Sequence, residues 1–281
     1  MSLHRSQRSV AILFSEHDQP DGYVISRLAD YWRQDGLHVE YLFGTERFVP
    51  ADALLLHVDL SVLPDDVLQF ASRYPLVINR HARDIRKRTF SRLLVARHDA
   101  YAGPVIVKSN LNFGGGPESG RHPSPLLRLY HRARRGWFRL LTGNRSYRIY
   151  ASKEEVPSPI WMDPDLVVEK FVPERHGDAF ALRTYHYFGE RDSFFLCTSQ
   201  EQIIKSSSTT RIDPLLPDPR LLTLRRELQL DYGKIDYVQL EGEPIILDIN
   251  KTVGLTEQSS EDPLLVTARR ERAQGIYDFL R

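Results

Sequence analysis

Two carboxylates and an amide oxygen gather in the stretch from Asp231 to Gly254. Asp236 lies within a first predicted strand, while Asp248 and Asn250 follow the apolar run Ile245–Leu247 of a second. Residues two apart in a strand point to the same face, and hairpin pairing can bring Asp236 alongside the other two side chains. This set of oxygen ligands suits Mg²⁺ held jointly with phosphate oxygens. The alternative is an edge hairpin whose polar face is simply solvated.

A lysine followed by a glycine-rich loop is the second feature with a chemical use. Lys108 ends the predicted turn and strand Gly103–Lys108, and Gly114, Gly115 and Gly116 follow a short polar segment. Glycine lets backbone N–H groups approach an anion and lysine adds a point charge, so this combination suits phosphate binding. The loop is not a P-loop, because no Gly-Lys-Ser/Thr follows the glycines. A flexible surface turn is the alternative.

Residues 121–150 hold eight arginines and no acidic residue. Four of these arginines recur at helical spacing and so line one stripe of a predicted helix: Arg128, Arg132, Arg135 and Arg139. The helix could present a solvated basic face, or it could dock an anionic substrate, an acidic partner or an acidic membrane. A local basic segment in a chain with a formal net charge of +1 does not predict nucleic-acid binding.

Strands that alternate with helices predict a small, mostly parallel α/β unit over roughly the first 80 residues. Its expected strands are 10–14, 39–43, 53–58 and 76–78, and its expected helices are 22–33 and 65–73. No Gly-x-Gly-x-x-Gly turn follows the first strand, so the unit is not predicted to bind a dinucleotide. The later chain is expected to form strands at 166–172, 179–188, 193–198 and 203–210, a linker at 214–220, and helices at 221–230 and 261–281.

Composition places the 281-residue chain among ordinary soluble globular proteins, with 41% hydrophobic and 27% charged residues. The N-terminus has no apolar signal core, and no apolar run approaches membrane-spanning length. The only cysteine, Cys197, lies in an apolar run and is expected to be a core thiol. A cytoplasmic location is therefore the default expectation. The chain could act as a homodimer, and its oligomeric state is not fixed by the sequence.

The order of these features along the chain resembles the ATP-grasp superfamily. The matching segments are Asn79 to Lys87, Pro104–Lys108, Gly114–Gly116, Val168–Val172, Arg183, and Asp236 with Asp248-Ile249-Asn250. The resemblance implies an α/β domain over residues 1–95 that precedes a two-subdomain ATP-grasp fold of the α+β class. Its N-terminal subdomain would cover 96–170 with the arginine-rich segment, and its C-terminal subdomain would cover 171–281 with the metal-binding hairpin.

The resemblance also implies roles for individual side chains. Lys87 and Lys108 match the two lysines that contact ATP phosphates, and the glycines match the phosphate loop. The segment Glu169-Lys170-Phe171-Val172 matches the hinge that binds adenine, with either Glu174 or Asp178 placed to contact the ribose. Arg183 matches the arginine that steadies phosphate or an acyl phosphate. A structural salt bridge is the alternative for Arg183, because a charge inside an apolar strand needs a partner.

The implied activity is an ATP- and Mg²⁺-dependent ligase that activates a carboxylate as an acyl phosphate for attack by an amine. Asp236, Asp248 and Asn250 match the metal-binding set, although the family more often has Glu where Asp248 stands, which leaves a second ion open. Mn²⁺ could replace Mg²⁺. The substrates would be small-molecule or peptide carboxylates and amines, with Lys205 and Arg211 as weaker substrate contacts. A small-molecule kinase of the same fold and a low-turnover nucleotide-binding module that docks a partner are the alternatives.

Overall fold

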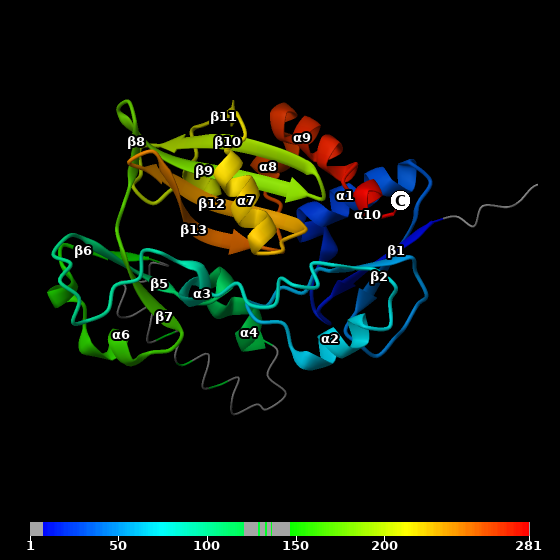
Figure 1. The fold of residues 1–281 in the computed structure, drawn as a ribbon, viewed down its shortest axis with the longest axis horizontal. Coiled ribbons are helices and arrows are strands. Elements are labelled where there is room, and N and C mark those ends of the chain that lie inside the picture. Colours follow the sequence, from blue (N-terminus) through cyan, green and yellow to red (C-terminus); the bar gives the residue numbers. More distant parts are fainter. Residues whose placement is uncertain (1–7, 121–128, 130–132, 134–135, 137–146, 281) are drawn as a thin grey trace, which may run out of the picture.

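The computed structural model describes residues 8–120, 129, 133, 136 and 147–280. The predicted stripe of Arg128, Arg132, Arg135 and Arg139 lies outside the described residues. The described chain forms three sheets that follow one another in sequence (Figure 1). Residues from the segments around all three sheets line one large cavity, the central cleft.

The first sheet is parallel, as the sequence predicts, and its strand order is β2-β1-β3-β4. Its strands are β1 (Ser9–Phe14), β2 (His38–Phe43), β3 (Ala53–Leu56) and β4 (Val77–Ile78). Parallel strands are covered on both faces and therefore read as continuous apolar runs. Alternate residues of β1 accordingly pack into two cores, Ile12 on the side of α1 (Val24–Gln34) and Leu13 on the side of α2 (Asp65–Ala71). The short helix η1 (Pro20–Gly22) precedes α1.

A small antiparallel sheet with the order β6-β5-β7 follows. Its strands are β5 (Val105–Ser109), β6 (Arg148–Tyr150) and β7 (Leu166–Lys170). The helices around it are α3 (Lys87–Phe90), η2 (Asn112–Gly115), α4 (Gly116–Gly120), η3 (Lys153–Glu155) and α6 (Ser158–Met162). Buried valines of β5 and β7 pack against Ile160 of α6, so one face of the sheet is covered and the other is available to the cleft.

The third sheet is antiparallel, with the order β11-β10-β9-β12-β13 and β8 paired to β9. Its strands are β8 (Glu174–His176), β9 (Ala179–Phe188), β10 (Arg191–Ser199), β11 (Arg211–Leu215), β12 (Tyr232–Leu240) and β13 (Glu243–Asn250). The helix α7 (Pro219–Glu227) packs over one face through Leu221, against Tyr185, Ile235 and Ile246. The strand predicted at 203–210 is wrong, because this segment is a loop around η4 (Ser206–Ser208) and the strand begins at Arg211.

The C-terminal helices return to the first domain (Figure 1). They are α8 (Glu257–Glu261), α9 (Pro263–Ala273) and α10 (Ile276–Phe279), where the sequence predicts one closing helix. Trp32 of α1 donates from Nε1 to the carbonyl of Ala273 at 2.7 Å, and Ile276 and Leu280 enter the same core. The C-terminal helices thus stabilise the core around α1. Within the described part, no helix is both long and apolar enough to cross a membrane.

Candidate functional site

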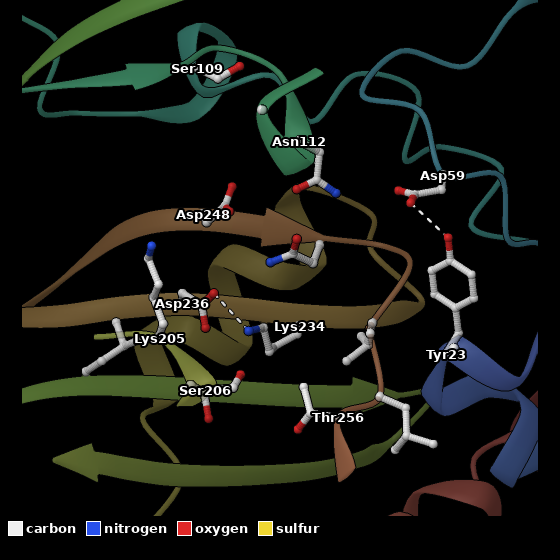
Figure 2. Close-up of a pocket in the computed structure, with 18 of the residues that line it drawn as sticks. Tyr23, Asp59, Ser109, Asn112, Lys205, Ser206, Lys234, Asp236, Asp248 and Thr256 are labelled. Carbon is white, nitrogen blue, oxygen red and sulfur yellow. Dashed lines mark hydrogen bonds and ion pairs between the residues drawn. The ribbon is translucent and has the colours of Figure 1, made fainter. Parts of the chain in front are cut away.

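The hairpin of β12 and β13 gathers the predicted metal ligands on one face. Its turn at Glu241 and Gly242 has φ angles of 52° and 83°, the left-handed pair typical of a two-residue hairpin. This turn alone would pair Asp236 with Leu247, but a register shift between Asp236 and Tyr237 places Asp236 opposite Asp248. Asn250 is two residues from Asp248 and therefore shares its face. All three predicted oxygen ligands line the cleft. Figure 2 shows two of them, Asp236 and Asp248.

Each carboxylate on this face is paired with a lysine. Lys234 Nζ lies 2.9 Å from Asp236 Oδ2, and Lys87 Nζ lies 3.0 Å from Asp248 Oδ1. The other oxygen of Asp236, Oδ1, is buried and has no hydrogen-bond partner among the described residues. Burial raises the pKa of Asp236 even though Lys234 lowers it. A buried carboxylate oxygen without a partner fits a site that accepts a cation.

The oxygen ligands of the hairpin are compatible with Mg²⁺ only if other ligands complete the coordination shell of the ion. The described residues contain no group of three or more His, Cys, Asp or Glu side chains arranged to hold a metal ion. Asp236 and Asp248 supply two carboxylates, and Asn250 adds an amide oxygen. Mg²⁺ is commonly held by one or two carboxylates together with water and substrate phosphates. The site therefore fits a metal that arrives with a phosphate ligand.

Two cavities meet at these side chains. The larger, of about 1230 Å³, extends between the hairpin, the glycine loop and the first domain. The smaller, of about 130 Å³, lies against the segment that follows β7. Lys87, Asp236 and Asp248 line both cavities. The charged cluster thus lies at the junction of a narrow pocket and a wide one.

The smaller cavity contains most of the predicted hinge. Lys170, Phe171 and Val172 line it together with Lys108. Glu169 is fully buried instead, and its Oε2 lies 2.7 Å from Lys108 Nζ. Glu169 pairs with Ile106 of β5 and so shares the face of Ile106 and Lys108, which line the cavity, but Glu169 itself is covered. Glu169 therefore acts on the site through Lys108 rather than by lining the pocket.

The glycine loop contributes one wall of the larger cavity. Gly114 and Gly115 have φ angles of 65° and 72°, which non-glycine residues rarely adopt. Gly114 lines the cavity, whereas a Cβ at Gly115 would lie 3.0 Å from Leu111 Cδ1. Gly116 begins α4 and lines neither cavity. Of the three predicted glycines, only Gly114 is placed to approach a ligand directly.

Arg183 does not enter either of these cavities, in contrast to the prediction from sequence. Its neighbours on β9, Leu182 and Thr184, line the larger cavity, so Arg183 points to the opposite face of the sheet. There its Nη2 lies 2.8 Å from Glu174 Oε1, and Glu174 also accepts a hydrogen bond from the backbone N–H of Gln239 at 2.7 Å. Both residues thus form the structural salt bridge that was the alternative interpretation of Arg183.

The remaining predicted contacts divide between the cleft and the surface. Lys205 lines the larger cavity, from the loop after β10. Arg211 is exposed and lies 2.7 Å from Asp213, away from the cleft. Asp178 is exposed in the β8–β9 turn and lines neither cavity. Since Glu174 is held by Arg183, neither residue predicted to contact the ribose is placed to do so.

Several cleft residues were missed from the sequence. Lys234 is two residues before Asp236, so strand periodicity could have placed it on the metal face, the side of the hairpin that carries Asp236, Asp248 and Asn250. Tyr147 lines both cavities, and burial raises its pKa. Asp59 follows the first domain's third strand, where ligands of parallel sheets bind. Cys197, expected in the core, lines the larger cavity instead.

The first domain closes the far end of the larger cavity. Asp59 accepts a hydrogen bond from Tyr23 Oη at 3.0 Å (Figure 2). It accepts a second from Thr252 Oγ1 at 2.7 Å. The backbone N–H of Val24 donates to the carbonyl of Val253 at 2.8 Å. The loop that follows the metal hairpin is therefore fixed against the first domain.

Asn79 holds the hairpin to the same domain. Its φ of 64° is left-handed, and its side chain donates to the carbonyl of Tyr232 at 2.9 Å and accepts from the Tyr232 N–H at 2.9 Å. Asn79 N–H also donates to Asp231 Oδ2 at 2.6 Å. The start of β12 is thereby fixed to the end of β4. This link sets where Lys234 and Asp236 lie relative to the first domain.

Comparison with solved structures identifies the fold. A RimK-domain ATP-grasp protein from Sphaerobacter thermophilus is 13% identical, with a TM-score of 0.54 over 96% of this chain and 98% of its own. A RiPP-associated ATP-grasp ligase from Chryseobacterium gregarium, solved with ADP and a leader and core peptide, is 9% identical, with a TM-score of 0.57 over 97% of each chain.

A third similar structure is the macrocyclase MdnC from Microcystis aeruginosa, bound to the precursor peptide MdnA. It is 12% identical, with a TM-score of 0.53 over 96% of this chain and 99% of its own. No family model matches the sequence, and no curated protein matches it. At these identities the likeness establishes the fold and not the activity. The chain has the ATP-grasp fold over nearly its whole length.

Proposed function

We propose that this protein is an ATP- and Mg²⁺-dependent ligase that activates a carboxylate as an acyl phosphate for attack by an amine. The observation that carries the proposal is the junction of the two cavities, where Lys87, Asp236 and Asp248 line both. A nucleotide with its base in the smaller cavity would extend its phosphates to this junction. The larger cavity beyond it has room for the groups that react.

The smaller cavity offers the surroundings that an adenine ring requires. Phe171, Val172 and Leu247 supply apolar walls. The N–H groups of Lys170 and Phe171 already donate to the carbonyls of Leu93 and Pro104, so other backbone groups of the hinge would meet the base. Lys108, held by Glu169, also lines this cavity, where its Nζ would meet the phosphates. A pocket of apolar walls with a few placed polar groups is typical of a cofactor site.

Charge stabilisation at the junction suits phosphoryl transfer. The transferred group carries negative charge spread over its oxygens, so cations rather than a general base lower the barrier. Lys87 and Lys108 would bind the phosphates, and Gly114 would bring backbone N–H groups near them. Mg²⁺ held by Asp236, Asp248 and Asn250 would neutralise phosphate charge when bound.

The reaction would then proceed in two steps, formation of an acyl phosphate and its attack by the amine. A carboxylate oxygen of the first substrate attacks the γ-phosphorus, the bond from the γ-phosphorus to the bridging oxygen breaks, and ADP leaves. The amine attacks the carbonyl carbon of the acyl phosphate, the C–N bond forms, and inorganic phosphate departs while the amine loses a proton. Tyr23 and Asp59 line the far end of the larger cavity, where the second substrate would lie.

Peptides are the first substrates to test. The Chryseobacterium ligase was solved with a leader and core peptide, and the Microcystis macrocyclase with a precursor peptide. The larger cavity, at about 1230 Å³, exceeds the roughly 300–1,000 Å³ typical of a small-molecule site, so it can accept a nucleotide's phosphates and a peptide side chain together.

Product analysis by ³¹P NMR tests the proposal. The protein is incubated with ATP, Mg²⁺ and panels of acidic peptides, amino acids and amines. Release of ADP and inorganic phosphate only when both an acid and an amine are present supports ligation. A stable phosphorylated product supports a kinase instead. Nucleotide binding without turnover in any combination favours a binding module.

A further inference from the structure

Lys234 places a positive charge inside the carboxylate cluster, at a position that the ligation steps above do not use. It lies opposite Asn250 in the hairpin and two residues before Asp236. Its Nζ is 2.9 Å from Asp236 Oδ2, and its side chain is 25% exposed. The ammonium therefore occupies space that a second metal ion would need.

The charge on Lys234 is maintained by its surroundings. Its ion pair with Asp236 Oδ2 favours the ammonium form of the side chain. It behaves as a fixed cation on the metal face of the hairpin.

The occupied oxygens limit how many metal ions can bind. Lys234 holds Asp236 Oδ2 and Lys87 holds Asp248 Oδ1, whereas Asp236 Oδ1 has no partner among the described residues. Ions in two-metal sites lie about 3.5–4 Å apart and share carboxylates. A second divalent ion bridging to Asp236 Oδ2 would displace the ammonium or meet its repulsion.

We propose that Lys234 takes the place of a second metal ion, so that the site binds one divalent cation with the nucleotide. The Lys234 ammonium then supplies the other positive charge to the phosphate oxygens. This inference rests on the proposed nucleotide site. Lys234 is a binding residue in this account, since it contacts the phosphates rather than a proton that is transferred.

Mn²⁺ and ADP are the probes for the test. Equilibrium binding of Mn²⁺, followed by electron paramagnetic resonance in the presence of saturating ADP, counts the ions for each chain. The wild type is expected to bind one Mn²⁺. Lys234→Ala is expected to bind two, with the line broadening of a coupled pair, and to lose about tenfold in ADP affinity at Mn²⁺ concentrations that fill one site. Lys234→Arg keeps the charge and should bind one.

Lys153→Ala is the matched control, because it removes a lysine whose partner, Glu154, lies outside the cleft. It should leave both the stoichiometry and the ADP affinity unchanged. Two Mn²⁺ ions in the wild type would overturn the inference, as would one ion and an unchanged ADP affinity in Lys234→Ala. If Lys234→Ala does not fold, the number of Mn²⁺ ions bound to the wild type still tests the inference, because two ions would overturn it. If the wild type binds no ADP at all, the proposed function fails and this inference falls with it.

Discussion

The Lys87 ammonium lies 3.0 Å from Asp248 Oδ1, and this ion pair joins helix α3 to strand β13 across the cleft. Lys87 is only 4% exposed, while the side chain of Asp248 is 23% exposed. The pair therefore links α3 to β13, the two elements between which the proposed nucleotide phosphates would lie. It also keeps the charge of the metal face balanced before any cation arrives.

A double-mutant cycle of Lys87→Met and Asp248→Asn should reveal a coupling of about 1–3 kcal/mol, because the pair is mostly shielded from water. The free energy of unfolding in urea measures it. The exposed pair Arg226 and Glu190, 3.7 Å apart, serves as the control and should show no measurable coupling. Additive effects of Lys87→Met and Asp248→Asn would contradict the ion pair.

Variants of Lys108 and Glu169 should distinguish the contribution of Lys108 to stability from its contribution to ADP binding. Lys108→Met leaves the fully buried Glu169 without its partner, so it should destabilise the fold by about 3–5 kcal/mol. The double variant Lys108→Met/Glu169→Gln should recover most of that stability but not the affinity for ADP. Thermal unfolding and ADP titration measure the two quantities. Recovery of ADP binding in the double variant would remove Lys108 from the nucleotide site.

Arg183→Met should lower stability without changing ADP affinity, since Arg183 binds Glu174 on the face of the sheet away from the cleft. The expected loss is about 1–3 kcal/mol, reduced from that of a fully buried pair because Arg183 is partly exposed. Glu174→Gln should cause a similar loss. A selective fall in ADP affinity or turnover in Arg183→Met would restore the phosphate role that the sequence predicts for Arg183.

The free energy of unfolding should depend on pH through the protonation of buried His57. Burial lowers the pKa of His57 to about 3, and neither ring nitrogen has a hydrogen-bond partner among the described residues. The unfolded chain binds a proton near pH 6.5 while the folded chain does not. Stability should therefore fall as the pH drops from 6.5 toward 3, by up to about 1.4 kcal/mol for each pH unit.

His57→Leu should reduce that slope, measured as the free energy of unfolding between pH 4.5 and 7. The exposed His38 provides the matched control, since His38→Leu removes a histidine that the fold does not bury. An unchanged slope in His57→Leu would mean that other groups set the acid sensitivity.

Part of the predicted ligand set follows from local information, because strand periodicity fixes that Asp248 and Asn250 share a side. The two-residue turn alone would pair Asp236 with Leu247, and the register shift that places Asp236 opposite Asp248 is not visible in the sequence pattern. The apolar runs around Leu13 likewise predicted the parallel sheet, because a strand covered on both faces needs them.

The placement of Arg183 depends on information that local sequence patterns do not contain. Alternation separates Arg183 from Leu182 and Thr184, but which face meets the cleft depends on where α7 packs, far along the chain. The partner of Lys108 is equally non-local, because it follows from the pairing of β5 with β7. The return of the C-terminal helices onto Trp32 also depends on tertiary packing alone.

The central claim is that the hairpin binds a divalent cation together with a nucleotide. Calorimetric titration of ADP into the wild type and into Asp236→Asn, each with and without Mg²⁺, tests it most directly. Mg²⁺ should tighten ADP binding at least about tenfold in the wild type, because the cation joins the phosphates to two carboxylates, and should do so little in Asp236→Asn. Equal ADP affinity with and without Mg²⁺ in the wild type, or an undiminished Mg²⁺ effect in Asp236→Asn, would contradict the account.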